Sequence, residues 1–223
     1  METLQRLVWY PLDHFPFVVI VLILAFAVHE FAHAYSAYKF GDRTAYDQGR
    51  VTLNPRVHLD VLGTILILIA GFGWAKPVPV NRGRFKSPRI MGIIVSVAGP
   101  LSNLLLAAIG VAMVVLFNAT GWHHGASDGV QTALAVFLDY LIKMNVLLFI
   151  FNLIPLPPLD GYRVIEDLAP QRVRIKMEQN VQWGMFIFLL IVFIPPLRAA
   201  TLDPLFRLSD PIITGMFRIF GLA

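Results

Sequence analysis

Residues 16–38 read PFVVIVLILAFAVHEFAHAYSAY, a stretch in which Glu30 is the only residue with a formal charge. A membrane-spanning helix needs roughly 20 mainly apolar residues, because each adds about 1.5 Å across a hydrocarbon core of about 30 Å. The stretch therefore predicts a helix that crosses a lipid bilayer. It is too long for the apolar part of a cleavable signal peptide, so we expect it to be a permanent first span.

Further apolar runs indicate several spans. Residues 90–117 hold no charged residue, and residues 131–155 hold one acidic and one basic side chain. Residues 181–197 are uncharged before the arginine that follows them but are short, which fits a tilted span. The tail from residue 204 is interrupted by charges and a proline, which is typical of a segment lying at the membrane interface.

The composition excludes the main classes of soluble protein. Hydrophobic residues make up 57% of the 223 residues and charged residues only 14%, where soluble domains carry about 25% charged residues. The mean hydropathy is +0.69. Cysteine is absent, which excludes a disulfide framework and a thiolate metal site. The net charge of +4 comes from basic loops between apolar runs. Such loops are typical of a membrane protein with several spans, so the charge does not indicate a nucleic-acid partner.

The basic loops constrain the topology. Lys and Arg gather at 39–60, 76–89 and 163–176, and basic loops favour the cytoplasmic side. All three share that side only if residues 61–75 dip into the membrane and return. A non-spanning backbone at membrane depth must be buried in protein or line a cavity. We therefore predict a re-entrant Gly/Pro-rich element after the first helix, and an outward-facing loop at 118–130.

The first span carries the motif His29-Glu30-Phe31-Ala32-His33. Histidines four residues apart share one helix face, a spacing that lets two imidazoles bind one zinc ion. Glu30 between them can act as the general base of a metallopeptidase. With six histidines and four glutamates in the chain, chance gives about 0.003 such matches. A buried polar patch without a function is the competing interpretation, but such groups are expensive inside a membrane.

A catalytic zinc needs a third protein ligand, and Asp160 is the best-placed carboxylate. It follows a run with three prolines at 155–158, which breaks a helix, and Gly161 permits a turn there. A simple helix exit with a capping aspartate explains this stretch equally well. Asp139 is a rival ligand, although Lys143 lies four residues further along and an internal ion pair accounts for both. His14 and His58 are expected at the membrane interface.

At this point the chain resembles a known family, the site-2 proteases, which are intramembrane zinc metallopeptidases. The resemblance covers about residues 16–165. It is to the compact bacterial branch of the family, which has no PDZ or CBS domain, and the length of this chain fits that branch. It rests on HEFAH at 29–33, Gly99-Pro100-Leu101-Ser102-Asn103, the run from Asn152 through Pro155 to Leu159-Asp160-Gly161, GWAKPVPVN at 73–81 and DRTAYDQGRVTLNP at 42–55.

The resemblance implies roles for individual residues. By it the ligands of one zinc ion per chain are His29, His33 and Asp160. Glu30 is then the catalytic base, and Asn152 positions the scissile carbonyl or its oxyanion. Asn103 matches the middle motif, and its role stays open between function and helix packing.

We therefore expect an all-α polytopic membrane protein with about four to six transmembrane helices. Residues 1–223 form a single membrane-embedded domain, with a catalytic core at about 16–165 and C-terminal helices at 181–223. The resemblance places it in a bacterial cell membrane as a multi-pass protein, with the active site towards the cytoplasm.

The expected activity is hydrolysis of peptide bonds in or near transmembrane segments, as in regulated intramembrane proteolysis. The implied partners are the lipid bilayer and substrates that are single-pass membrane proteins or signal-peptide remnants. Three alternatives stay open: a metal-handling transporter, an inactive scaffold that binds membrane helices, and a peptidase for soluble peptides. The sequence leaves the substrate and the oligomeric state undetermined.

Overall fold

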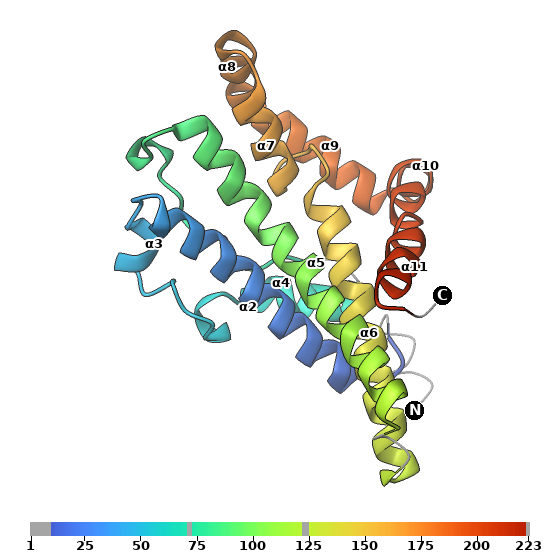
Figure 1. Cartoon of the computed structure of the whole chain (residues 1–223). Helices are drawn as coiled ribbons and strands as arrows, with labels where there is room; N and C mark the ends of the chain where they lie inside the picture. Colours follow the sequence, from blue (N-terminus) through green and yellow to red (C-terminus); the bar gives the residue numbers. More distant parts are fainter. Residues whose placement is uncertain (1–9, 71–72, 122–124, 222–223) are drawn as a thin grey trace.

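The computed structural model describes residues 10–70, 73–121 and 125–221. Every regular element in these ranges is a helix, as expected for an all-α protein (Figure 1). In chain order the helices are α2 (Phe15–Lys39), α3 (Thr44–Asp47), η1 (Pro55–Val57), α4 (Val61–Ala70), η2 (Arg82–Arg84), α5 (Pro88–Thr120), α6 (Asp128–Asn152), α7 (Asp160–Leu168), α8 (Gln171–Gln179), α9 (Val181–Phe193), α10 (Pro195–Phe206) and α11 (Ser209–Ile219).

Three helices, α2, α5 and α6, are long and apolar enough to cross a membrane. They correspond to the expected spans at 16–38, 90–117 and 131–155. Helix α9 together with the chain that follows it meets the same criteria, but the two parts bend by 93° at the break between them. The described residues thus hold three candidate spans, or four if the bent pair crosses as one, at the lower end of the expected range.

The expected run at 181–197 ends early because of two prolines. Helix α9 stops at Phe193, and Ile194 has an extended backbone with φ −96° and ψ 109°. A residue before proline is pushed away from the helical region, and Pro195 and Pro196 then begin α10, where a missing N–H costs nothing. The prolines therefore separate two helices where the apolar pattern predicts one.

Helix α5 lies at the centre of the bundle and contacts α2, α6 and α7 (Figure 1). Val21 of α2 packs with Leu138 and Leu141 of α6, and residues of α5 pack against this cluster. Gly110 of α5 lets α6 approach closely, since a Cβ there would lie 2.8 Å from Cγ1 of Ile142. Small residues at helix interfaces allow this close approach in membranes, where van der Waals packing drives association.

The re-entrant element is supported by the path of the chain around α4. This helix has ten residues, about 15 Å of length, which is half a membrane. After it the chain returns to its starting point, because the Lys76 N–H donates to the His58 carbonyl over 2.8 Å. Gly63 of α4 lies directly against the backbone of Trp74. The chain thus leaves and returns at the same place on the two sides of α4, which supports a re-entrant element.

The extended segment 73–81 is tied to the bundle at its far end. The Asn81 N–H donates to Oδ2 of Asp42 over 2.6 Å. Arg82 then reaches α7, with ion pairs of 2.8 Å to Glu166 and 3.0 Å to Asp167. Asp167 is fully buried, and burial raises the pKa of its carboxyl although the Arg82 charge opposes this.

We expect Arg82→Ala to destabilise the fold by about 3–5 kcal/mol, because it leaves the buried Asp167 carboxylate without its ion-pair partner and Glu166 with Arg163 alone, at 3.4 Å. The measurement is thermal unfolding in detergent. Arg84→Ala is the matched control, since Arg84 is about half exposed and lies 3.9 Å from Asp42, and it should cost no more than about 1 kcal/mol. Equal losses in the two variants would contradict a structural role for the Arg82 pairs.

Single cysteines test the re-entrant topology without background, because the chain has none of its own. Asp47, Arg84 and Ser127 are all exposed. We expect Asp47→Cys and Arg84→Cys to react with an impermeant reagent from the same side of sealed vesicles, and Ser127→Cys from the opposite side. Labelling of positions 47 and 84 from opposite sides would show that residues 61–75 span the membrane.

Candidate metal centre

Helix α2 presents both histidines of its motif towards α5. His29 and His33 are buried, with 6% and 8% of their surface exposed. Their spacing of four residues places the two rings on one face, and their Nε2 atoms lie 3.0 Å apart. The two imidazoles thus lie together on one face of the helix, as the spacing of the motif predicts.

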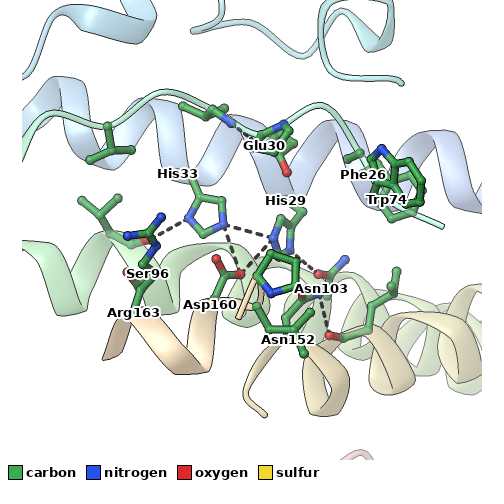
Figure 2. A pocket seen from close by; sticks show the side chains of 18 of the residues that line it. Phe26, His29, Glu30, His33, Trp74, Ser96, Asn103, Asn152, Asp160 and Arg163 are labelled. Carbon is green, nitrogen blue, oxygen red and sulfur yellow. Dashed lines mark hydrogen bonds and ion pairs between the residues drawn. The ribbon is translucent and has the colours of Figure 1, made fainter. Parts of the chain in front are cut away.

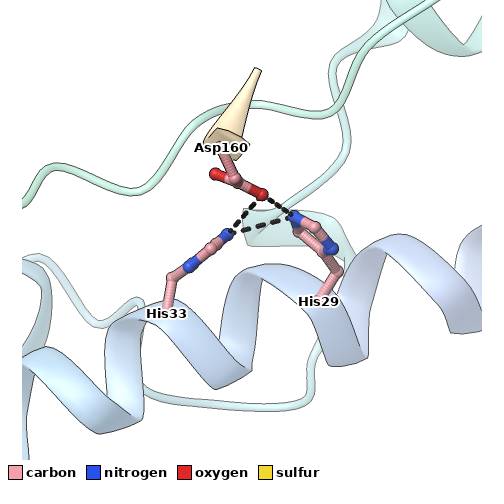
Figure 3. A group of neighbouring side chains, drawn as sticks. All are labelled: His29, His33 and Asp160. Carbon is pink, nitrogen blue, oxygen red and sulfur yellow. Dashed lines mark hydrogen bonds and ion pairs between the residues drawn. The ribbon is translucent and has the colours of Figure 1, made fainter. Parts of the chain in front are cut away.

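Asp160 reaches the two histidines because α6 is broken after Asn152. The following stretch holds the prolines, and Asp160 is the first residue of α7. The break is tight, since a Cβ on Gly161 would collide with the backbone of Leu153 and Ile154. Figure 3 shows the carboxylate pointing at both rings, with Oδ2 lying 3.2 Å from Nε2 of His29 and 3.3 Å from Nε2 of His33.

The two separations from Asp160 Oδ2, 3.2 and 3.3 Å, are close to those that a zinc ion needs, and the 3.0 Å between the two Nε2 atoms is somewhat shorter. Zinc binds imidazole and carboxylate at about 2.0–2.2 Å, and tetrahedral geometry then puts its ligand atoms roughly 3.3–3.4 Å apart. Oδ2 of Asp160 is buried and has no hydrogen-bond partner among the described residues. Two histidines and one carboxylate leave a fourth position open, which is typical of a catalytic rather than a structural site.

The charge state of Asp160 also suits a metal ligand. Burial by itself raises the pKa of this carboxyl, but the adjacent His33 and His29 outweigh the burial and hold the pKa well below its usual range. The carboxylate is therefore ionised at neutral pH. Ligand atoms must be deprotonated to bind a metal, so Asp160 needs no further adjustment.

Hydrogen bonds at the opposite ring nitrogens set the tautomers of both histidines. Nδ1 of His33 donates to the Val95 carbonyl over 2.7 Å, and Nδ1 of His29 donates to Oδ1 of Asn103 over 2.7 Å. The Asn103 amide is oriented in turn by a 2.9 Å bond to Asn145. When the rings are neutral, as metal binding requires, each Nε2 then has its lone pair free, the usual arrangement around metal-binding histidines.

This network gives Asn103 a role that the sequence left open and adds a residue that it missed. The only signal for Asn145 was an amide within the apolar run 131–155. Val95 acts through its carbonyl, which no residue pattern could indicate. Gly99 makes room for the rings, since a Cβ there would lie 2.7 Å from Cε1 of His29 and closer still to His33.

Glu30 lies on the other side of the ligand group from Asp160, against the extended segment (Figure 2). Its carboxylate is buried, with 7% of the residue exposed. Oε2 accepts a hydrogen bond of 2.9 Å from the Val78 N–H. One oxygen is thus held by the backbone, and Oε1 is the oxygen available for proton transfer.

A cavity of about 650 Å³ connects these groups. Its wall includes the three grouped side chains, Glu30 and Asn152, whose Nδ2 donates to the Leu148 carbonyl over 3.0 Å. The rival ligand Asp139 lies elsewhere on α6, in a 2.6 Å ion pair with Lys143. Among the described residues, the group that could hold a metal is His29, His33 and Asp160.

Of the two histidines expected at the membrane interface, His58 is held inside the protein. The residue is completely buried, and its Nε2 donates to the Thr52 carbonyl over 2.7 Å. Burial lowers the pKa of this imidazole, so the ring is neutral at physiological pH. His14 is about one-third exposed and lies 3.2 Å from the Tyr140 hydroxyl near the start of α2.

Comparisons with known proteins agree with this geometry. A family model described as "Peptidase family M50" matches residues 123–194, which include Asn152 and Asp160. The chain is 52% identical over 214 residues to a Bacillus subtilis (strain 168) protein named "Putative zinc metalloprotease YwhC", and the match covers 96% of each chain.

Two more distant relatives are both named "Putative zinc metalloprotease Rip2". The one from Mycolicibacterium smegmatis is 28% identical over 84% of this chain and 71% of its own length. The one from Mycobacterium tuberculosis is 29% identical over 87% of this chain and 72% of its own length. No solved structure gives a significant match. The similarity to YwhC over nearly the whole of both chains shows that this protein belongs to peptidase family M50, the site-2 proteases, and is an intramembrane zinc metalloprotease.

Proposed function

We propose that His29, His33 and Asp160 hold one zinc ion per chain, and that the enzyme hydrolyses peptide bonds in or near transmembrane segments of membrane proteins. The observation that carries this proposal is the meeting of three ligand atoms within 3.3 Å of one another. They meet in a cavity bordered by the membrane-spanning helices α2, α5 and α6. A site in this position gives access to substrates that lie in the bilayer.

Zinc at this position supplies a Lewis acid that polarises the scissile carbonyl and lowers the pKa of water towards neutrality. Glu30 does the proton transfer. Its Oε2 is occupied by the Val78 N–H, so Oε1 takes a proton from the attacking water and returns it to the departing amide nitrogen. The C–O bond forms first and places negative charge on the substrate oxygen; the C–N bond breaks when the nitrogen takes the proton from Glu30, and the products are an amine and a carboxylate.

Asn152 is proposed to stabilise the substrate oxygen on which negative charge develops. Its amide carries two N–H groups, and one of them donates to the Leu148 carbonyl. The second is left for the substrate. Preorganised donors of this kind typically contribute about 2.7–4 kcal/mol of transition-state stabilisation.

A helix protects its peptide bonds by internal hydrogen bonding, so the substrate is proposed to enter as an unwound stretch. The cavity of about 650 Å³ that borders the proposed ligands and Glu30 is where this stretch would lie. The proposed substrates are single-pass membrane proteins or signal-peptide remnants whose helices unwind locally, as in regulated intramembrane proteolysis.

We place the enzyme in the cell membrane as a multi-pass protein with its active site towards the cytoplasm. Helix α3, the start of α5 and the α7–α8 pair lie at one end of the bundle, and the end of α5 and the start of α6 lie at the other (Figure 1). Basic residues gather at 39–60, 76–89 and 163–176, next to the elements at the first of these ends. Positive loops favour the cytoplasmic side.

Metal analysis tests the ligand set. We expect close to one zinc per wild-type chain, and a loss of about 10-fold or more in His33→Ala and Asp160→Ala, because two remaining ligands bind zinc weakly. His14→Ala is the matched control, since it removes an imidazole outside the cavity and should keep its zinc. Undiminished zinc in Asp160→Ala would assign the third ligand position to another residue.

Glu30→Gln tests the mechanism and the activity together. Glutamine keeps the shape of glutamate and can accept the Val78 hydrogen bond, but it cannot take a proton from water. Loss of a general base costs about 10²–10⁴ in rate, and we expect the upper end because Glu30 also protonates the leaving amine. The measurement is cleavage of a panel of membrane-helix substrates in detergent, with zinc content measured in parallel.

The control for this experiment is Glu178→Gln, which removes an exposed carboxylate of α8 that pairs with Arg174. It should cleave at the wild-type rate. Near-normal cleavage by Glu30→Gln would refute the assignment of Glu30 as the base. Zinc-loaded wild type that cuts soluble peptides but no membrane helix would refute the proposed substrate class.

A further inference from the structure

Arg50 is a buried cation close to the site that the mechanism above does not use. It lies between α3 and η1, and only 5% of its surface is exposed. Its Nη2 donates to the Lys76 carbonyl over 2.7 Å and its Nη1 to the Pro77 carbonyl over 3.3 Å. Burying a guanidinium is costly, and a purely structural link between loops does not need a charge.

The two carbonyls that Arg50 holds come directly before the Val78 amide in the chain. That amide is the donor to Oε2 of Glu30, over 2.9 Å. The backbone is also held from the loop that contains Arg50, because the Lys76 N–H donates to the His58 carbonyl over 2.8 Å. A continuous series of contacts thus joins the guanidinium to the proposed catalytic base.

We propose that Arg50 is the positioning residue of the general base. By fixing the Lys76 and Pro77 carbonyls it aims the Val78 N–H at Glu30, so that one carboxylate oxygen is held and the other faces the water. This inference rests on the proposed function of Glu30, and it assigns a task to the stretch DRTAYDQGRVTLNP at 42–55.

The electrostatic surroundings of Arg50 agree with this assignment. Burial lowers the pKa of the guanidinium, and the negative charge of Glu30 opposes that effect. The cation therefore lies within the field of the carboxylate. The planar fork of arginine matches two neighbouring carbonyls, whereas the single ammonium of lysine acts as a point charge.

The first test compares Arg50→Gln and Arg50→Lys with the matched control Arg56→Gln, which removes an exposed arginine from the same loop. A base displaced by about 1 Å loses roughly 10²-fold in rate. We expect kcat to fall about 10–100-fold in Arg50→Gln, with KM within about threefold of wild type and zinc content unchanged. Arg50→Lys should recover part of kcat, and Arg56→Gln should equal wild type.

A double-mutant cycle separates positioning from general support of the fold. Val78→Pro removes the N–H that donates to Glu30 and keeps the Arg50 side chain, so Arg50→Gln should cost little more in that background, because both changes act on one series of contacts. Additive losses in kcat would overturn the proposal. So would a loss confined to KM or to zinc content in Arg50→Gln.

Hydrogen exchange at the Val78 amide tests the inference without any substrate. We expect this amide to exchange roughly tenfold faster in Arg50→Gln than in wild type and Arg56→Gln. Unchanged exchange in Arg50→Gln would overturn the positioning role even if the enzyme is active. Faster Val78 exchange in Arg50→Gln would support the positioning role even if the wild-type enzyme fails to cleave membrane helices. That failure would refute the proposed substrate class alone.

Discussion

A pair of imidazoles inside an apolar membrane helix is tolerable only if each ring nitrogen has a partner, and most of the fold serves that requirement. Helix α5 supplies the outer partners, the Asn103 side chain and the Val95 carbonyl. The break between α6 and α7 supplies the inner carboxylate of Asp160. Helix α5 also contacts each helix that carries a ligand, so the packing that buries apolar surface also fixes the geometry of the site.

The parts of the site that were predictable from sequence are those with a local cause. Four residues of helix must bring His29 and His33 together, and a run of prolines must end a helix before Asp160. Main-chain groups leave no such trace. The Val95 carbonyl and the Val78 N–H hold functional side chains, yet any residue at these positions offers the same atoms. Their contribution depends on how distant segments of the chain pack. No residue pattern in a single sequence predicts that packing.

Long apolar runs predicted the bounds of the helices well where helix signals were uninterrupted and less well where prolines intervened. The run at 181–197 has the hydropathy of a span, but Pro195 and Pro196 end α9 at Phe193. The two prolines, and not the hydropathy, mark the end of α9 in the sequence. His58 shows the reverse case. Its loop position suggested an interface, but the fold buries it beneath the returning segment at Lys76.

The separation of the ligands along the chain has a consequence for how the protein is made. Asp160 follows His33 by 127 positions, and a ribosome adding about 5–20 residues per second needs roughly 6–25 s to cover that distance. The histidine pair therefore enters the membrane well before its third ligand exists. Helix α5 emerges within this interval and brings Asn103 and the Val95 carbonyl, which satisfy one nitrogen of each ring. With the proposed ligand set, metal loading needs Asp160 and therefore follows the synthesis of α7.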